Sequence, residues 1–223
     1  MKNILFLFHA AMIAGCVSIP FEKPVFVPLE AENPVHMVET FQASIPPQVQ
    51  LLTTAVFEYN GQTFHGIGAL AINHRDNSFT LACMNPMGVK LFEISGNDQQ
   101  TVTHSVLAPL ASYGDVASAI ANDIRRMYFK TTPSHLTRLQ KRKDRFIFSE
   151  SSGAGDLEYI FGGQRGTVVE KQYREDRALV WRVMYFEYQE YQGKQYPKGI
   201  VYLNYEHGYR LTVRHKEMRF ENN

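Results

Sequence analysis

The stretch LVWRVMYF at residues 179–186 has the composition of a β-strand, because aromatic and β-branched residues favour a pleated backbone. Its two alternating faces are both largely apolar. A strand with one face in water alternates apolar and polar side chains. We therefore expect each face of this strand to be covered, by a helix on one side and by a cavity or a second sheet layer on the other.

Strand-like runs separated by turn residues lie on both sides of this stretch. Asn60-Gly61, for example, separates two such runs, and Asn-Gly is a hairpin signal because both residues tolerate positive φ. The chain is thus predicted to be mainly β, with antiparallel connections. The expected strands are Gln50–Tyr59, Gln62–Asn73, Ser78–Met84, Val89–Ser95, Gln100–Ser105, Arg145–Glu150, Asp156–Phe161, Gly166–Arg174, Ala178–Tyr188, Gly199–Glu206 and Gly208–Lys216.

One main amphipathic helix interrupts the strands in the middle of the chain. Ser112 is expected to cap it, with Asp115 three residues on in the manner of a capping box. Val116, Ile120 and Ile124 then fall on one face. We expect this face to pack into the core, with a partner-binding face as the alternative. A short helical turn is also expected at residues 134–140.

Composition and charge suit one globular domain. The chain has 223 residues, with 23 Lys+Arg against 22 Asp+Glu, and it is rich in Tyr and Phe. The balanced charge argues against a nucleic-acid partner, which would favour a basic excess. No apolar run is long enough to span a bilayer as a helix. We expect a monomer without a cofactor.

The first sixteen residues, MKNILFLFHAAMIAGC, have the plan of a secretory signal, with a charged start, an apolar centre and small residues at its end. The small pair followed directly by Cys16 resembles a bacterial lipobox. That resemblance implies that residues 1–15 are a signal peptide and that Cys16 carries diacylglycerol and an N-terminal acyl group such as palmitate. The alternatives are an ordinary signal peptide with a chance cysteine, or an N-terminal core segment.

Residues 16–48 are predicted to be a proline-rich tether. Repeated prolines remove backbone donors and disfavour helix in the residues before them. Apolar residues such as Phe21 and Phe26 indicate that part of this segment lies against the domain, and a short helix at 35–43 fits the pattern. The domain itself is predicted over residues 49–223.

Several pieces of the chain resemble a known family. They include the lipobox, the segment NPMGVKLFEI at 85–94, the helix ending RRMYF at 125–129, and LNYEHGYRLTV at 203–213. Together they resemble the DUF3261 type of bacterial lipoprotein, which is similar to the outer-membrane lipoprotein receptor LolB and its periplasmic carrier LolA. The resemblance implies a strongly curved antiparallel half-barrel, with the helix packed in its open side and an apolar cavity that holds acyl chains.

No motif for catalysis or metal binding survives inspection. The G-x-G-x-x-A spelling at 66–71 lacks the following helix that a dinucleotide site needs, so its glycines are expected to let the sheet bend. The histidines form no pair at metal-ligand spacing with supporting residues. Cys83 is expected to be a buried thiol. We therefore expect neither an enzyme nor a metal site.

Two sets of residues are candidates for contact with lipid. An apolar cavity is assigned by strand alternation and helix face to Phe79, Leu81, Phe92, Ile124, Trp181 and Tyr185. Pro86 and Met87 lie at the tip of a turn and are candidates for a membrane-contact loop, with packing of Met87 against the sheet as the alternative.

The leading hypothesis is a lipid-anchored cell-envelope protein that binds or transfers an acyl chain, a lipoprotein or another apolar ligand. Val17 follows Cys16, where the enteric retention signal has Asp, so the expected location is the periplasmic face of the outer membrane. The second hypothesis is a non-enzymatic interaction module of an envelope complex.

Overall fold

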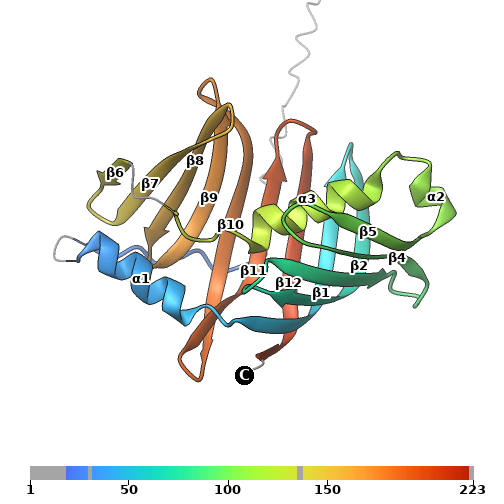
Figure 1. The fold of residues 1–223 in the computed structure, drawn as a ribbon, viewed down its shortest axis with the longest axis horizontal. Helices are drawn as coiled ribbons and strands as arrows, with labels where there is room; N and C mark the ends of the chain where they lie inside the picture. The colour runs from blue at the N-terminus through green and yellow to red at the C-terminus, as the bar shows by residue number, and fades with distance from the viewer. Residues whose placement is uncertain (1–18, 30–31, 135–137, 221–223) are drawn as a thin grey trace, which may run out of the picture.

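A computed structural model describes residues 19–29, 32–134 and 138–220. Every strand in these ranges belongs to one antiparallel sheet in the order β5-β4-β3-β2-β1-β12-β11-β10-β9-β8-β7-β6 (Figure 1). The strands are β1 (Gln48–Tyr59), β2 (Gln62–Asn73), β3 (Ser78–Met84), β4 (Lys90–Gly96), β5 (Thr101–Val106), β6 (Arg138–Lys141), β7 (Arg145–Ser152), β8 (Gly155–Gly162), β9 (Thr167–Glu175), β10 (Ala178–Tyr191), β11 (Lys194–Asn204) and β12 (Tyr209–Phe220).

The prediction of a mainly β, antiparallel chain is confirmed. The hairpin at Asn60-Gly61 forms as expected, with φ of 49° and 75° at these residues. Pairing of β1 with β12 joins the first five strands to the last seven. The clearest difference in strand bounds lies between β10 and β11, which continue to a two-residue turn at Gln192-Gly193, both with positive φ. The sequence predicted a longer connection there.

In the described part of the chain, three helices accompany the sheet: α1 (Pro34–Ser44), α2 (Ala108–Ala111) and α3 (Val116–Tyr128). The N-cap of α3 is Asp115, whose side chain accepts from the Ser118 amide, and not Ser112. Ser112 ends α2 instead, where its hydroxyl donates to the carbonyl of Pro109. The predicted helical turn at 134–140 is also corrected, because residues 138–141 form strand β6, paired with β7.

The main core lies between the sheet and the two longer helices (Figure 1). Helix α3 contacts β4, β5 and β11, and α1 contacts β9 and β11. Of the face of α3 that was predicted to be apolar, Ile124 is buried and Ile120 packs half-buried against the same cluster, whereas Val116 at the start of the helix is half-buried. The core is therefore built on one face of the sheet.

Residues 19–29, which we call the N-terminal strap, begin on the opposite face of β10 and β11 and end in the main core, which Val27 and Leu29 join. Phe21 is buried in a separate apolar cluster with Phe186 and Val201, and the Phe21 and Phe186 rings stack with centroids 5.3 Å apart. Farther along, the Phe26 ring lies 4.3 Å from the guanidinium of Arg145. The second apolar face of residues 179–186 is thus covered at Met184 and Phe186 by this strap, and not by a cavity or a second sheet layer.

Candidate functional site

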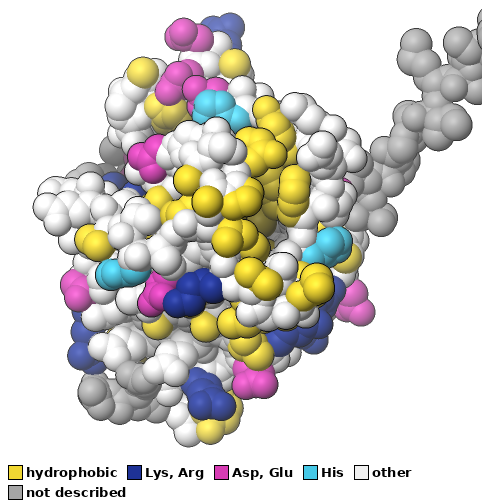
Figure 2. Space-filling model, turned by 90° about the vertical axis from the view of Figure 1, so that its right-hand side faces the viewer, with side chains coloured by type: hydrophobic (Ala, Val, Ile, Leu, Met, Phe, Trp, Pro, Cys, Tyr) yellow, Lys and Arg dark blue, Asp and Glu magenta, His cyan; other side chains and the backbone are white. Residues whose placement is uncertain are grey.

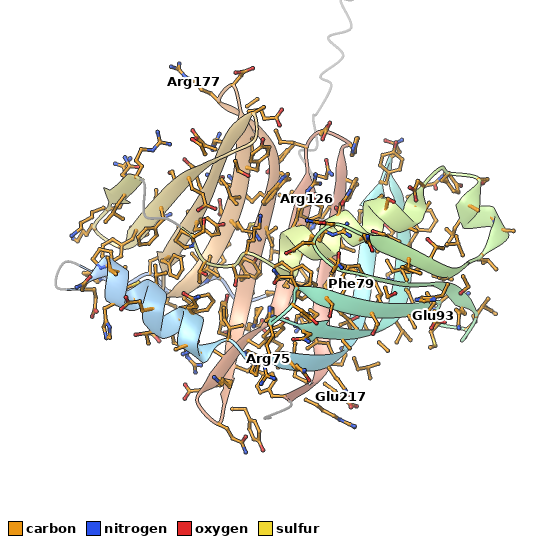
Figure 3. The ribbon with its side chains drawn as sticks, in the orientation of Figure 1. Arg75, Phe79, Glu93, Arg126, Arg177 and Glu217 are labelled. Atoms are coloured by element: carbon orange, nitrogen blue, oxygen red, sulfur yellow. The ribbon has the colours of Figure 1, made fainter. Side chains whose placement is uncertain are left out.

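The six cavity candidates all belong to the core between the helices and the sheet. Phe79, Ile124, Trp181 and Tyr185 are buried there, and Leu81 and Phe92 pack against the same cluster. Phe79 is seen beside α3 in Figure 3. The structure brings these side chains together as predicted by alternation, but it places them in packed core.

A cavity of about 20 Å³ lies in this core, lined in part by Phe41, Met127, Tyr185 and Ile200. Its volume suits about one water molecule. An acyl chain therefore needs either a rearranged core or another place on the molecule.

The core face of the sheet is not fully covered at the turn between β1 and β2. Phe57 and Phe64 are directly paired there, with ring centroids 6.2 Å apart. Phe64 lies on the same face of β2 as Leu70 and Ile72, because side chains alternate along a strand. Leu70 and Ile72 are 5% and 2% exposed, whereas Phe64 is 49% exposed. This part of the core face is open to solvent.

Small side chains lie next to these rings on the same face. Ala55 pairs with Gly66, and Gly68 with Cys83. A β-carbon at Gly66 would lie 2.9 Å from the Cys83 sulfur, so the Cys83 side chain occupies the space beside Gly66. Burial raises the pKa of the Cys83 thiol to about 11, which keeps it neutral at physiological pH. The surface beside the aromatic rings is therefore uncharged.

Further exposed hydrophobic side chains lie on neighbouring segments at the same end of the molecule. Figure 2 looks onto this end, which lies on the right in Figure 1, and shows hydrophobic side chains gathered in its middle. We define the apolar end as Phe57, Tyr59, Phe64, Met84, Met87, Val89, Leu107 and Tyr113, of which all but Phe57 are at least 37% exposed. Sequence reasoning missed most of them, although the aromatic residues on both sides of the Asn60-Gly61 turn were a signal that could have found Phe57, Tyr59 and Phe64.

The predicted membrane-contact loop belongs to this end. Met87 is 88% exposed and does not pack on the sheet, and Pro86 is exposed beside it. Hydrogen bonds inside the loop stabilise its conformation, because the side chain of Asn85 accepts from the amides of Met87 and Val89. Its shape thus does not depend on burying Met87.

Tyr209 and Asp123 form a hydrogen-bonded polar pair at the border of the apolar end. The Tyr209 ring lies 5.1 Å from that of Phe57, and its hydroxyl donates to the carboxylate of Asp123 at 2.7 Å. Burial raises the pKa of Asp123 to about 6, against the opposing hydrogen bond from Tyr209 and the charge of Arg126. Arg126 points across α3 toward the sheet (Figure 3) and donates to the Tyr202 hydroxyl at 2.6 Å.

Beneath α3, the side chain of Lys171 is fully buried. Its ammonium donates to the carbonyl of Phe129 at 2.8 Å and to that of Lys130 at 3.3 Å, at the C-terminal end of the helix. Burial, aided by the charge of Lys130, lowers the pKa of Lys171 to about 7. This group fixes the helix end and touches no solvent.

Within the described ranges, no three His, Cys, Asp or Glu side chains gather as metal ligands would. No helix in those ranges has the length and hydropathy to cross a bilayer. The predicted signal peptide, residues 1–15, and the predicted lipid-bearing Cys16 lie outside the described residues.

Comparison with known proteins gives a family and a fold. The model of a family described as "Protein of unknown function (DUF3261)" matches residues 49–217. Among curated proteins, no sequence matches. A LolA superfamily protein from Nitrosomonas europaea is similar with a TM-score of 0.57 at 12% identity, over 86% of this chain and 96% of that one. A putative outer membrane lipoprotein-sorting protein domain from Vibrio parahaemolyticus has a TM-score of 0.52 at 9% identity, over 86% and 94%.

Proposed function

The chain belongs to the DUF3261 family and has a LolA-like fold, and from these premises we propose that it binds an acyl chain of a lipid or lipoprotein at its apolar end. The single observation that carries the proposal is the exposure of Phe64 on the core face of β2. An aromatic side chain on that face gains nothing for folding while it stays in water, whereas it gains from covering an apolar partner.

The driving force would be the hydrophobic effect. Each buried methylene contributes about 0.8 kcal/mol, and association itself costs several kcal/mol, so most of a long acyl chain would have to lie over Phe57, Phe64 and the rest of the apolar end. Ala55 is small and leaves room beside these rings, whereas the side chains of Cys83, Thr53 and Leu81 fill the space next to Gly66 and Gly68. A deeper site among Trp181, Tyr185 and Ile124 would require α3 to shift, since these side chains fill the space beneath it.

The β3–β4 loop would make the first contact with the lipid. Met87 and Pro86 stand out in water on a loop that Asn85 holds in shape. A flexible apolar side chain at such a tip suits insertion among lipid chains. This loop lies at the apolar end, so a chain drawn from a bilayer or a cargo would meet the aromatic side chains next.

A lipid anchor at Cys16 fits this function and would place the protein in the cell envelope, on the periplasmic face of the outer membrane if the host has two membranes. Only Val17 and Ser18 separate Cys16 from the packed strap that begins at Ile19. An extended chain spans about 3.3–3.6 Å per residue. The anchor would therefore hold the strap within roughly 10 Å of the lipid.

The ligand proposal is tested by mass spectrometry of lipids extracted from the protein purified from its own membranes. An enriched acylated species that is displaced by a palmitoyl probe is the expected result. Neither a co-purified lipid nor saturable binding of the probe would contradict the proposal. The anchor is tested separately by metabolic labelling with a fatty-acid analogue, where wild type should be labelled and Cys16→Ser should not.

A further inference from the structure

The small cavity of the core lies at the end of the sheet away from the apolar end. Its walls come from α1, the C-terminal end of α3, the β2–β3 turn and β11, with Phe41, Ile45, Met127 and Ile200 among the apolar side chains. It measures about 20 Å³. His74, in the turn that follows β2, also lines it, next to Arg75 at the lower edge of the molecule (Figure 3).

Three polar side-chain atoms in this wall are buried without a hydrogen-bond partner among the described residues. They are His74 Nε2, Gln195 Oε1 and the hydroxyl oxygen of Tyr196. Tyr196 is only 4% exposed. Other tyrosines of the same wall have partners: the Tyr185 hydroxyl donates to the carbonyl of Met127 and that of Tyr188 to the carbonyl of Val168.

Three unpaired atoms in one wall call for a shared partner. Leaving a buried polar atom unpaired costs about as much as a lost hydrogen bond plus its desolvation, and folded proteins rarely leave such atoms unpaired. The His74 and Tyr196 rings are neighbours, with centroids 6.2 Å apart, and both residues line this cavity. Gln195, which precedes Tyr196 on β11, lines the same cavity.

The chemistry of the three groups selects the occupant. The Tyr196 hydroxyl donates, the Gln195 oxygen accepts, and an imidazole nitrogen does either according to its tautomer. Burial lowers the pKa of His74 to about 4 and raises that of Tyr196, so the wall is uncharged and disfavours an ion. The occupant must therefore be neutral, the size of one heavy atom, and both donor and acceptor.

We propose that this cavity is a binding site for one internal water molecule, which bridges His74, Gln195 and Tyr196. Three hydrogen bonds are the usual number for a buried water, and the volume suits one. The water links the β2–β3 turn to β11, across the ends of β1 and β12 that lie between them in the sheet. This site lies at the C-terminal end of β2, whereas Phe64 lies near its N-terminal end.

A crystal structure of the full chain at high resolution tests this directly. A solvent peak about 2.6–3.2 Å from all three atoms is expected. Density without a solvent peak, or rotation of His74 or Tyr196 to a protein partner, would overturn the proposal.

Tyr196→Phe gives an independent test in solution, because the sign of its effect depends on the water. With the water present, the substitution removes a hydrogen bond, and the urea midpoint of unfolding falls. Without it, the hydroxyl is an unpaired buried group, and the midpoint stays or rises. Tyr188→Phe is the matched control: it lines the same cavity, donates to a carbonyl, and should lower the midpoint in either case.

Discussion

The ring of Phe21 lies directly over Gly199, so closely that a β-carbon at position 199 would overlap its edge. Gly199 pairs with Phe186 on β10, and the rings of Phe21 and Phe186 stack above it. Arg214 completes the contact, with its guanidinium 4.4 Å from the Phe21 ring. The Phe21 ring of the strap can therefore pack on the sheet only because residue 199 has no side chain.

Gly199→Ala should destabilise the fold by about 1–3 kcal/mol, as overpacking of a filled site does. Backbone strain does not contribute, because φ at Gly199 is not positive. Urea unfolding of the wild type and the variant measures the loss. In a Phe21→Ala background the ring is gone, and the same substitution should cost close to nothing. An equal loss in both backgrounds would show that the strap does not press on this residue.

Phe64→Ser should weaken binding of an acyl probe by roughly three- to tenfold, since covering the exposed half of an aromatic side chain contributes about half of the roughly 1.5–3 kcal/mol of full burial. The unfolding free energy should fall by about 1 kcal/mol, because the buried half of Phe64 and its contact with Phe57 are lost as well. Fluorescence titration with a palmitoyl probe measures the affinity. Tyr191→Ser is the control: Tyr191 is 62% exposed at the turn between β10 and β11, away from the apolar end. Equal losses in both variants would refute a site at the apolar end.

Met87→Asp should reduce co-sedimentation with phospholipid vesicles several-fold while leaving the thermal midpoint unchanged. A carboxylate at the tip of the loop resists entry into lipid, and Met87 supports no packing at 88% exposure. The amides of residues 87 and 89 keep their bonds to Asn85 in the variant, so the loop keeps its shape. Tyr191→Asp adds the same charge elsewhere, and a similar drop in that variant would point to net charge and not to the loop.

Most of the sheet could be predicted because its turns carry local chemistry. Asn60-Gly61 sits where φ must be positive, and the bounds of β2 and β3 follow from alternation. The ends of β10 and β11 could not be placed, because Gln192 adopts positive φ without being a glycine or asparagine. The cap of α3 was missed because Ser112 and Asp115 are both good capping residues, and which of them begins the helix depends on α2 and the turn between the two helices.

The candidate site was harder to predict, for a physical reason. Alternation shows which face of a strand a residue occupies, and Phe79, Trp181 and Tyr185 do lie in the core, while their predicted role in lining a ligand cavity stays a prediction. It does not show how far a helix extends over that face. Phe64 and Ile72 lie on one face of the same strand, yet one is exposed and the other buried. The alternation along β2 does not separate them.

The stability of the protein should rise with pH in the neutral to alkaline range because of Lys171. Its pKa is about 7 in the folded protein and 10.5 in the unfolded chain. Between these values the unfolded chain binds more protons than the native protein, so the unfolding free energy increases with pH, by up to about 1.4 kcal/mol per unit. Below pH 7 the group is charged in both states, and its contribution is constant.

Lys171→Met removes this dependence while keeping the length of the side chain. The unfolding free energy of the wild type relative to the variant should be flat below pH 7 and grow by on the order of 3 kcal/mol between pH 6.5 and 9.5, as measured by urea unfolding at each pH. Taking the difference cancels the titration of the tyrosines and of Cys83. Lys216→Met, at an exposed position of β12, should follow the wild type throughout. If Lys171→Met also follows the wild type, the buried ammonium beneath α3 keeps an ordinary pKa, and solvent reaches the end of that helix.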